Sequence, residues 1–130
     1  MLIRKLFQND KGFTLVEIIA VLVILGILAA IAVPRYVDLE SNARLKAFNT
    51  AIAEINGREN LTWADHKISE SGYITDAKIY NDMKFNLDPN FKWSSGDPTV
   101  SGGTLEFKGE IFSLSRKVST SIEPAFWTRN

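Results

Sequence analysis

The feature that most constrains this chain is an uninterrupted apolar run near its start. From Ile18 to Val33 every residue is apolar or glycine, and extending the run back to Phe13 gives 21 residues with one charge. At about 1.5 Å per helical residue the run spans about 31 Å, close to the ~30 Å hydrocarbon core of a bilayer. A buried helix in a chain of 130 residues would not be apolar on every face over this length. The run therefore predicts a membrane helix or a secretory signal.

An ordinary secretory signal is one alternative. Arg4, Lys5 and Lys11 form a basic segment before the run, and residues 30–32 offer an A-x-A cleavage site. Against cleavage there, the run reaches or exceeds the roughly 7–15 apolar residues of a signal, and Pro34 lies just beyond the site. A plain membrane anchor is a second alternative.

The one charge in the run belongs to Glu17. A carboxylate inside a membrane helix costs on the order of 2.5–3.5 kcal/mol at the bilayer centre, and less near an end of the helix. Either Glu17 lies near the cytoplasmic face and reaches the headgroups, or it pairs with a cation from another chain. A discarded signal would have no use for such a charge, so Glu17 favours a retained segment with a function.

The residues around Glu17 resemble the N-terminal motif of the type IV pilin family, which includes the pseudopilins of type II secretion. The matching residues are Gly12, then FTLVE at residues 13–17, then the apolar run and Pro34. The resemblance covers about the first quarter of the chain. It implies that a prepilin peptidase cleaves between Gly12 and Phe13 on the cytoplasmic side, and that the new Phe13 terminus is N-methylated.

The resemblance also implies that Glu17 pairs with the α-amino group of Phe13 on a neighbouring subunit, and a buried charge is tolerated when it is paired. Gly26 and Ala30 form a small-xxx-small pair, which would let helices approach closely. The alternative is that this spacing arises by chance in an alanine-rich segment. Together with Pro34, these are the predicted assembly residues. The implied partners are other copies of the chain and related pilins, the prepilin peptidase/N-methyltransferase, and an inner-membrane assembly platform.

Charge and cysteine content agree with this interpretation. Without residues 1–12 the chain has 12 basic and 14 acidic residues, a net charge of −2. A basic leader before a mixed-charge remainder fits the positive-inside rule, which places the leader in the cytoplasm. The chain has no cysteine, which excludes thiol chemistry. Many pilins close a C-terminal loop with a disulfide, so this chain departs from them, and pilus and pseudopilus stay open as alternatives.

Four segments are expected along the chain: a leader (1–12), a hydrophobic transmembrane helix (13–34), its amphipathic continuation (35–68) and a small C-terminal β-sheet head (69–130). Leu45, Phe48, Ile52 and Ile55 recur at helical spacing and predict one apolar face. Glu54 and Arg58 are spaced for an ion pair on this helix. Gly72 offers a left-handed cap after it. The expected fold class is α+β and pilin-like, with a long N-terminal helix packed against a small antiparallel sheet of about three strands.

Alternating residues predict three strands, at 91–94, 104–108 and 111–115, after a helical turn near 76–83. Residues 108–110 predict a tight hairpin turn, and residues 94–103 a loop. The sheet face toward the helix is predicted to consist of Phe91, Trp93, Leu105, Phe107, Phe112 and Leu114. In the tail, Ile122, Phe126 and Trp127 either cover a sheet edge or contact another subunit.

The sequence gives little support for catalysis, calcium binding or nucleic-acid binding. His66 and Asp65 are adjacent on the helix and so point about 100° apart, which does not make a catalytic dyad. Residues 88, 90 and 97 are Asp, Asn and Asp, which could offer oxygen ligands to Ca²⁺ but lack EF-hand spacing, so turn formation is expected. Arg116–Lys117 is the one adjacent basic pair outside the leader, too little for a nucleic-acid footprint.

We therefore expect a structural subunit of a type IV filament, with no catalytic residue, cofactor or metal. It would span the inner membrane once before assembly and then become part of a periplasmic or cell-surface filament. The alternative is a single-pass anchored extracytoplasmic binding domain that does not polymerise.

Overall fold

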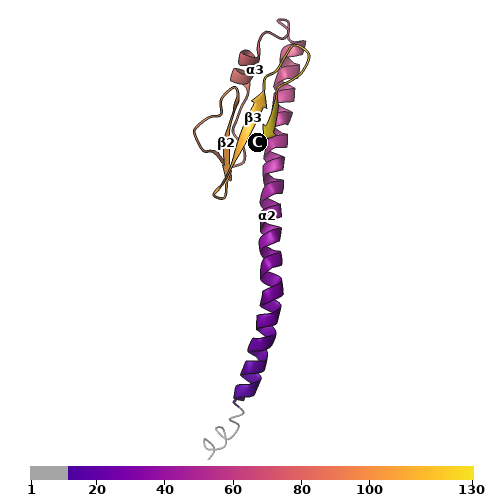
Figure 1. Cartoon of the computed structure of the whole chain (residues 1–130). Helices are drawn as coiled ribbons and strands as arrows, with labels where there is room; N and C mark the ends of the chain where they lie inside the picture. The colour runs from indigo at the N-terminus through magenta and orange to yellow at the C-terminus, as the bar shows by residue number, and fades with distance from the viewer. Residues whose placement is uncertain (1–11) are drawn as a thin grey trace, which may run out of the picture. The chain divides into compact units, whose positions relative to one another are not determined.

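A computed structural model describes residues 12–130 (Figure 1). Arg4, Lys5, Lys11 and the predicted leader up to residue 11 lie outside the described residues. The elements are helices α2 (Leu15–Ile68) and α3 (Asp76–Asp82) and strands β1 (Phe91–Trp93), β2 (Gly102–Phe107), β3 (Glu110–Lys117) and β4 (Phe126–Arg129). The expected α+β class is confirmed, with a sheet of four strands where about three were predicted. The chain divides into two compact units, one ending at Ser41 and one beginning at Asn42.

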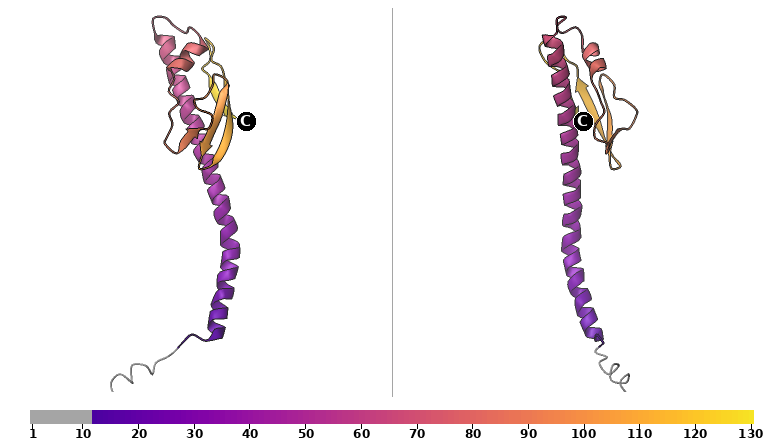
Figure 2. Two further views of the ribbon diagram at one scale, coloured as in Figure 1. Left: turned by 90° about the vertical axis from the view of Figure 1, so that its left-hand side faces the viewer. Right: turned by 180° about the vertical axis from the view of Figure 1, so that it is seen from behind.

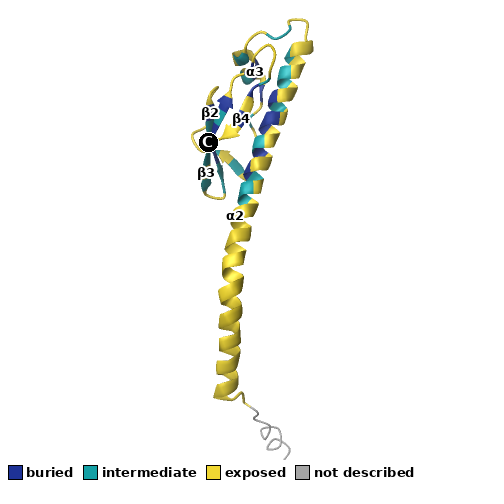
Figure 3. Cartoon of the chain, turned by 45° about the vertical axis from the view of Figure 1, so that its right-hand side comes forward, coloured by how far each residue is buried: buried dark blue, intermediate teal, exposed yellow. Residues whose placement is uncertain are grey.

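The part of α2 in the first unit is exposed on every side. All residues from 12 to 41 are exposed, including 16 large hydrophobic side chains from Leu15 to Leu39 besides Phe13 (Figure 3). Among the described helices, α2 alone is long and apolar enough to cross a membrane. Pro34 lies inside α2, where its missing N–H leaves the carbonyl of Ala30 without the usual i+4 donor. Within residues 12–130 this stretch is covered by no other segment, and an apolar surface of this extent is typical of one that contacts lipid or other protein.

In the second unit, one face of α2 packs against the sheet (Figure 2). Phe48, Ala51 and Ile55 are buried in the core, while Leu45 and Ile52 are partly buried. The predicted apolar face is therefore confirmed. The helix ends at Ile68, and Gly72 has the positive φ of 63° expected of a left-handed residue.

The sheet is antiparallel throughout, with strand order β1-β2-β3-β4. Its inner face carries the six predicted residues, of which Leu105 and Leu114 are buried and the other four partly buried against the core. β2 and β3 are joined by Lys108 and Gly109, between the paired residues Phe107 and Glu110. Both linking residues have positive φ, 49° and 83°, as a type I′ hairpin turn requires. The predicted hairpin is thus confirmed.

The tail forms the fourth strand. β4 pairs with β3, and Trp127 at its centre is fully buried. The Nδ2 of Asn56 on α2 donates to the carbonyl of Trp127 at 3.0 Å, and the Trp127 N–H donates to Asn56 Oδ1 at 2.7 Å. The side-chain amide of Asn56 thus takes the place of a further strand beside β4 and satisfies the backbone N–H and carbonyl of Trp127. Of the three tail residues, Trp127 packs in the core of its own chain, whereas Ile122 and Phe126 are exposed.

Candidate functional site

The predicted cleavage site lies in an exposed segment before α2. Residues 12–14 are not helical, and all three are exposed. A Cβ built on Gly12 would meet no heavy atom within 4 Å, and Phe13 is 84% exposed. The peptide bond between Gly12 and Phe13 therefore lies in an exposed, non-helical part of the described chain, as binding by a protease requires.

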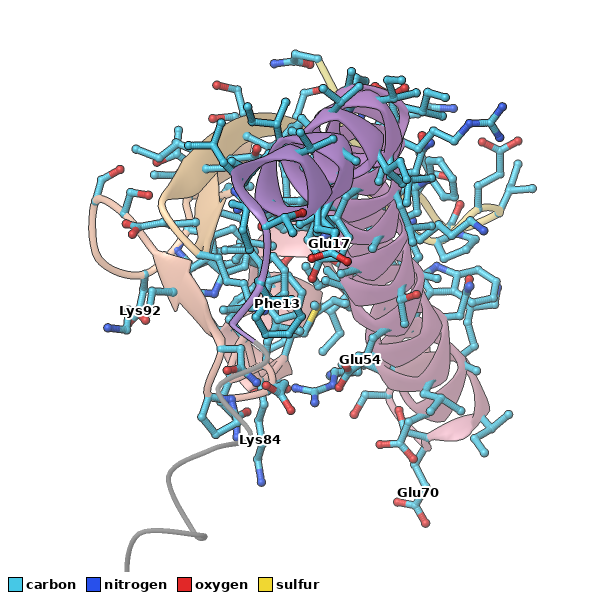
Figure 4. All side chains as sticks on the ribbon, turned by 90° about the horizontal axis from the view of Figure 1, so that it is seen from below. Phe13, Glu17, Glu54, Glu70, Lys84 and Lys92 are labelled. Atoms are coloured by element: carbon cyan, nitrogen blue, oxygen red, sulfur yellow. The ribbon has the colours of Figure 1, made fainter. Side chains whose placement is uncertain are left out.

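Glu17 lies in the first turn of α2, and its carboxylate folds back on the start of the helix (Figure 4). The Thr14 N–H donates to Glu17 Oε2 at 2.7 Å, and the Glu17 N–H donates to Thr14 Oγ1 at 3.2 Å. This reciprocal pair is a capping box, with Thr14 as the N-cap and Glu17 at the third helical position. Each side chain satisfies a backbone N–H that has no partner within the helix.

The other predicted assembly residues lie on the exposed surface of the same unit. Gly26 and Ala30 are exposed, and a Cβ on Gly26 would meet nothing within 4 Å. Within the described residues, no hydrogen bond joins Phe13 to Glu17. The structure therefore places the predicted assembly residues Phe13, Glu17, Gly26, Ala30 and Pro34 on one exposed stretch, where partners from outside the chain can reach them.

A buried charged cluster in the second unit was not predicted. Arg116 on β3 donates from Nε and Nη2 to the carboxylate of Glu59 on α2, and both side chains are fully buried. Its Nη1 and Nη2 also donate to the two oxygens of Asp76 at 2.8 and 2.9 Å. Trp127 Nε1 donates to Glu59 Oε1 at 2.8 Å, and Ser119 donates to Asp76 from N and Oγ. The cluster thus ties α2, α3, β3 and β4 together.

Periodicity could have located both buried charges. Glu59 follows Ile55 by four residues on the apolar stripe of α2, and Arg116 follows Leu114 by two on the inward face of β3. Each is a charged residue in phase with apolar ones. A charge is rarely buried without a partner, so two such positions of opposite sign in one small domain indicate an ion pair.

The cluster shifts the ionisation of its members. Burial would raise the pKa of Asp76, but the hydrogen bonds from Arg116 and Ser119 outweigh it and hold this pKa below its ordinary value. Burial would lower the pKa of Arg116, but Asp76 and Glu59 raise it above its ordinary value. Both groups stay charged across the physiological range.

We predict that Asp76 makes the head sensitive to acid. Because the pKa of Asp76 is lower in the folded chain than the ordinary value of about 3.9, the unfolded chain binds more protons in acid. The stabilisation is complete above about pH 5 and is lost as the pH falls through the folded-state pKa. Denaturation of the full chain in detergent at pH 7 and pH 3 should show a smaller pH dependence for Asp76→Asn than for wild type. Asp65→Asn, an exposed control, should keep the wild-type dependence.

The remaining candidate residues have local roles. His66 Nε2 lies 2.9 Å from Asp82 Oδ2 on α3, not against Asp65, and Lys78 also binds Asp82. The Asp88 carboxylate accepts from the backbone and side chain of Asn90, as in an Asx-turn. Within residues 12–130 no three His, Cys, Asp or Glu side chains are grouped to hold a metal ion. The predicted Glu54–Arg58 ion pair is present.

Comparison with known proteins finds a family match at the N-terminal segment and relatives that match most of the chain. The family model described as the prokaryotic N-terminal methylation motif matches residues 7–33. The chain is 30% identical over 109 residues to the type IV narrow pilus major component PilA5 of Thermus thermophilus, covering 84% of this chain and 90% of that protein. It is 51% identical over 116 residues to the fimbrial protein EcpC of Eikenella corrodens, covering 78% and 76% of the two chains.

A fimbrial protein of Pseudomonas aeruginosa is 34% identical over 80 residues, covering 62% of this chain and 49% of that protein. No solved structure gives a significant match to the chain. The relatives extend well beyond the methylation motif into the head. The motif, the exposed apolar helix and the antiparallel sheet agree with these relatives, and the chain belongs to the type IV pilin family.

Proposed function

We propose that this chain is the precursor of a filament subunit that is cleaved between Gly12 and Phe13, methylated at Phe13 and polymerised through the first part of α2. The observation that carries the proposal is the apolar surface of α2 up to Val33, which is exposed on all sides and carries the single carboxylate of Glu17. Lipid can cover this surface in the precursor. Other subunits must cover it once the subunit leaves the membrane.

In the assembled filament, Glu17 pairs with the α-amino group of Phe13 on a neighbouring subunit. This cation exists only after cleavage, so processing would create the partner that the carboxylate needs. A subunit inserted out of register would leave one carboxylate unpaired among apolar side chains, which is unfavourable. Gly26 and Ala30 would let neighbouring helices approach, because neither side chain extends beyond Cβ.

A pilus is favoured over a type II secretion pseudopilus, because the relatives are named as pilus and fimbrial proteins. The partners would be other copies of the chain, the prepilin peptidase/N-methyltransferase and an inner-membrane assembly platform. The subunit would wait in the inner membrane and end in a cell-surface filament. The chain itself would act as a structural element and catalyse nothing.

Mass spectrometry of the purified protein and electron microscopy of sheared surface material test this proposal together. We expect a mass that starts at methylated Phe13 and filaments that contain the chain. An intact Met1 without filaments would support the anchored binding domain instead. A mature chain that starts at Val33 would support an ordinary secreted protein.

We predict that Gly12→Asp blocks processing. The new side chain would place a bulky charge beside the scissile bond, where the wild-type backbone is bare. The variant should remain as a full-length band on a gel and form no filaments. Gly57→Asp is a matched control, because Gly57 is also exposed with open space around its Cα. A cleaved Gly12→Asp chain would contradict the predicted cleavage site.

A further inference from the structure

The capping box gives Glu17 a partner within its own chain. Thr14 and Glu17 exchange two hydrogen bonds, with the Thr14 N–H on Oε2 and the Glu17 N–H on Thr14 Oγ1. Both residues are downstream of the bond between Gly12 and Phe13. The box can therefore exist in the precursor and in the processed chain alike, before any neighbouring subunit is present.

The apolar surroundings make this contact more important than the same contact would be in water. The first N–H groups of a helix have no acceptor within the helix, and the hydrocarbon region offers no water to replace one. The box satisfies the N–H of Thr14 and the N–H of Glu17. It also places a negative carboxylate at the positive end of the helix dipole, where it is stabilised.

The capping box also makes the two oxygens of the Glu17 carboxylate inequivalent. Oε2 accepts from the Thr14 N–H at 2.7 Å, whereas among the described residues no hydrogen bond reaches Oε1. A carboxylate has about four lone-pair sites, so Oε1 keeps its capacity to accept. Because Oε2 is held by the backbone, the direction in which Oε1 faces is limited.

We propose that Thr14 is a positioning residue for assembly, which holds the carboxylate of Glu17 at the start of α2 so that Oε1 remains available for the cation of an incoming subunit. This inference rests on the proposed pairing of Glu17 with a neighbouring Phe13 amine. Thr14 acts through Glu17 and does not itself contact the neighbour. Its hydroxyl matters because it accepts from the Glu17 N–H, a role that serine can fill and valine cannot.

Filament yield tests the role of the hydroxyl. Thr14→Val keeps the size and β-branching of threonine but removes the acceptor, and we expect about 3- to 30-fold fewer filaments with normal membrane insertion and cleavage, the range that loss of an N-cap implies. Thr14→Ser should restore the yield. Thr50→Val is the matched control, because the Thr50 hydroxyl bonds the Lys46 carbonyl in an exposed part of α2. Wild-type yield from Thr14→Val would overturn the proposal.

Amide hydrogen exchange tests whether the Thr14 hydroxyl and the Glu17 carboxylate hold each other in place. In the full chain in detergent micelles, we expect the Glu17 amide to exchange faster in Thr14→Val than in wild type, and to recover in Thr14→Ser. The residue 14 amide, which donates to Glu17 Oε2, should also exchange faster in Thr14→Val, because the carboxylate is then no longer held in place. An unchanged Glu17 amide in Thr14→Val would also overturn the proposal.

A variant at Glu17 separates this inference from the proposed function. If Glu17→Val fails to assemble while Thr14→Val assembles normally, the pairing role stands and the positioning role is wrong. If both assemble normally, the pairing role itself is wrong, and the positioning role falls with it.

Discussion

Arg116→Met is expected to lower the free energy of unfolding of the head by about 3–5 kcal/mol, the range measured when one partner of a buried ion pair is removed. The substitution leaves Glu59, which is fully buried, without its cation, and it leaves Asp76 with only Ser119. Methionine fills most of the space of the arginine stem, so the loss reflects the unpaired carboxylates more than a cavity. For a unit of this size, the unfolding midpoint should fall by about 12 °C or more.

The adjacent residue provides a matched control. Lys117 lies next to Arg116 on β3 but points outward, where its pair with Glu123 is 72% and 63% exposed at the two side chains. Lys117→Met should change stability by about 0–1 kcal/mol, as is usual for a surface ion pair. Tryptophan fluorescence is a suitable measurement, since Trp127 donates to Glu59 and is fully buried. Equal effects at Arg116 and Lys117 would contradict the stabilising role of the cluster.

A double variant tells the ion pair apart from packing. Glu59→Gln removes the buried negative charge that Arg116→Met leaves unpaired, while keeping an acceptor for Trp127 Nε1. We expect the combined chain to be more stable than Arg116→Met alone, because no unpaired charge then remains in the core. Additive losses would show that the two residues act independently.

The sequence predicted elements well where a local rule decides them. The end of α2, the turn at Lys108–Gly109 and helix α3 follow from periodicity, glycine and capping residues. The Thr14–Glu17 box was also readable, because T-x-x-E before an apolar run is a helix-start signature. The family resemblance implies a partner for Glu17 on another subunit, whereas the capping box gives it one within its own chain.

The elements that the sequence did not predict depend on contacts distant along the chain. β4 has four residues, and its identity as a strand rests on pairing with β3 and on Asn56, which lies 71 residues away. Glu59 is neutralised by Arg116 because of where β3 packs along α2. The two residues are distant in the sequence, so no local pattern predicts their contact. With no cysteine in the chain, the Arg116 cluster and the Asn56 amide anchor the C-terminal segment where a disulfide could otherwise do so.

Glu17→Val is expected to abolish filaments while leaving membrane insertion and cleavage intact. Insertion should persist because valine is more favourable than glutamate in a bilayer, and Gly12–Phe13 lies outside the helix that the substitution changes. Assembly should fail because the Phe13 amine of a neighbouring subunit would enter an apolar contact without its carboxylate. An unpaired charge costs on the order of 2.5–3.5 kcal/mol at the centre of a bilayer, equivalent to about a hundredfold loss at each subunit addition.

Two further variants test whether the position and the reach of the Glu17 carboxylate matter for assembly. Glu70→Val removes an exposed carboxylate between α2 and α3 (Figure 4) and should leave the number of filaments seen by electron microscopy unchanged. Glu17→Asp keeps the charge but shortens its reach, so it should assemble less than wild type and more than Glu17→Val. Filaments of normal number from Glu17→Val would show that the carboxylate is not needed for assembly. Its role would then be limited to the capping box with Thr14, where one charge serves to start a helix in lipid.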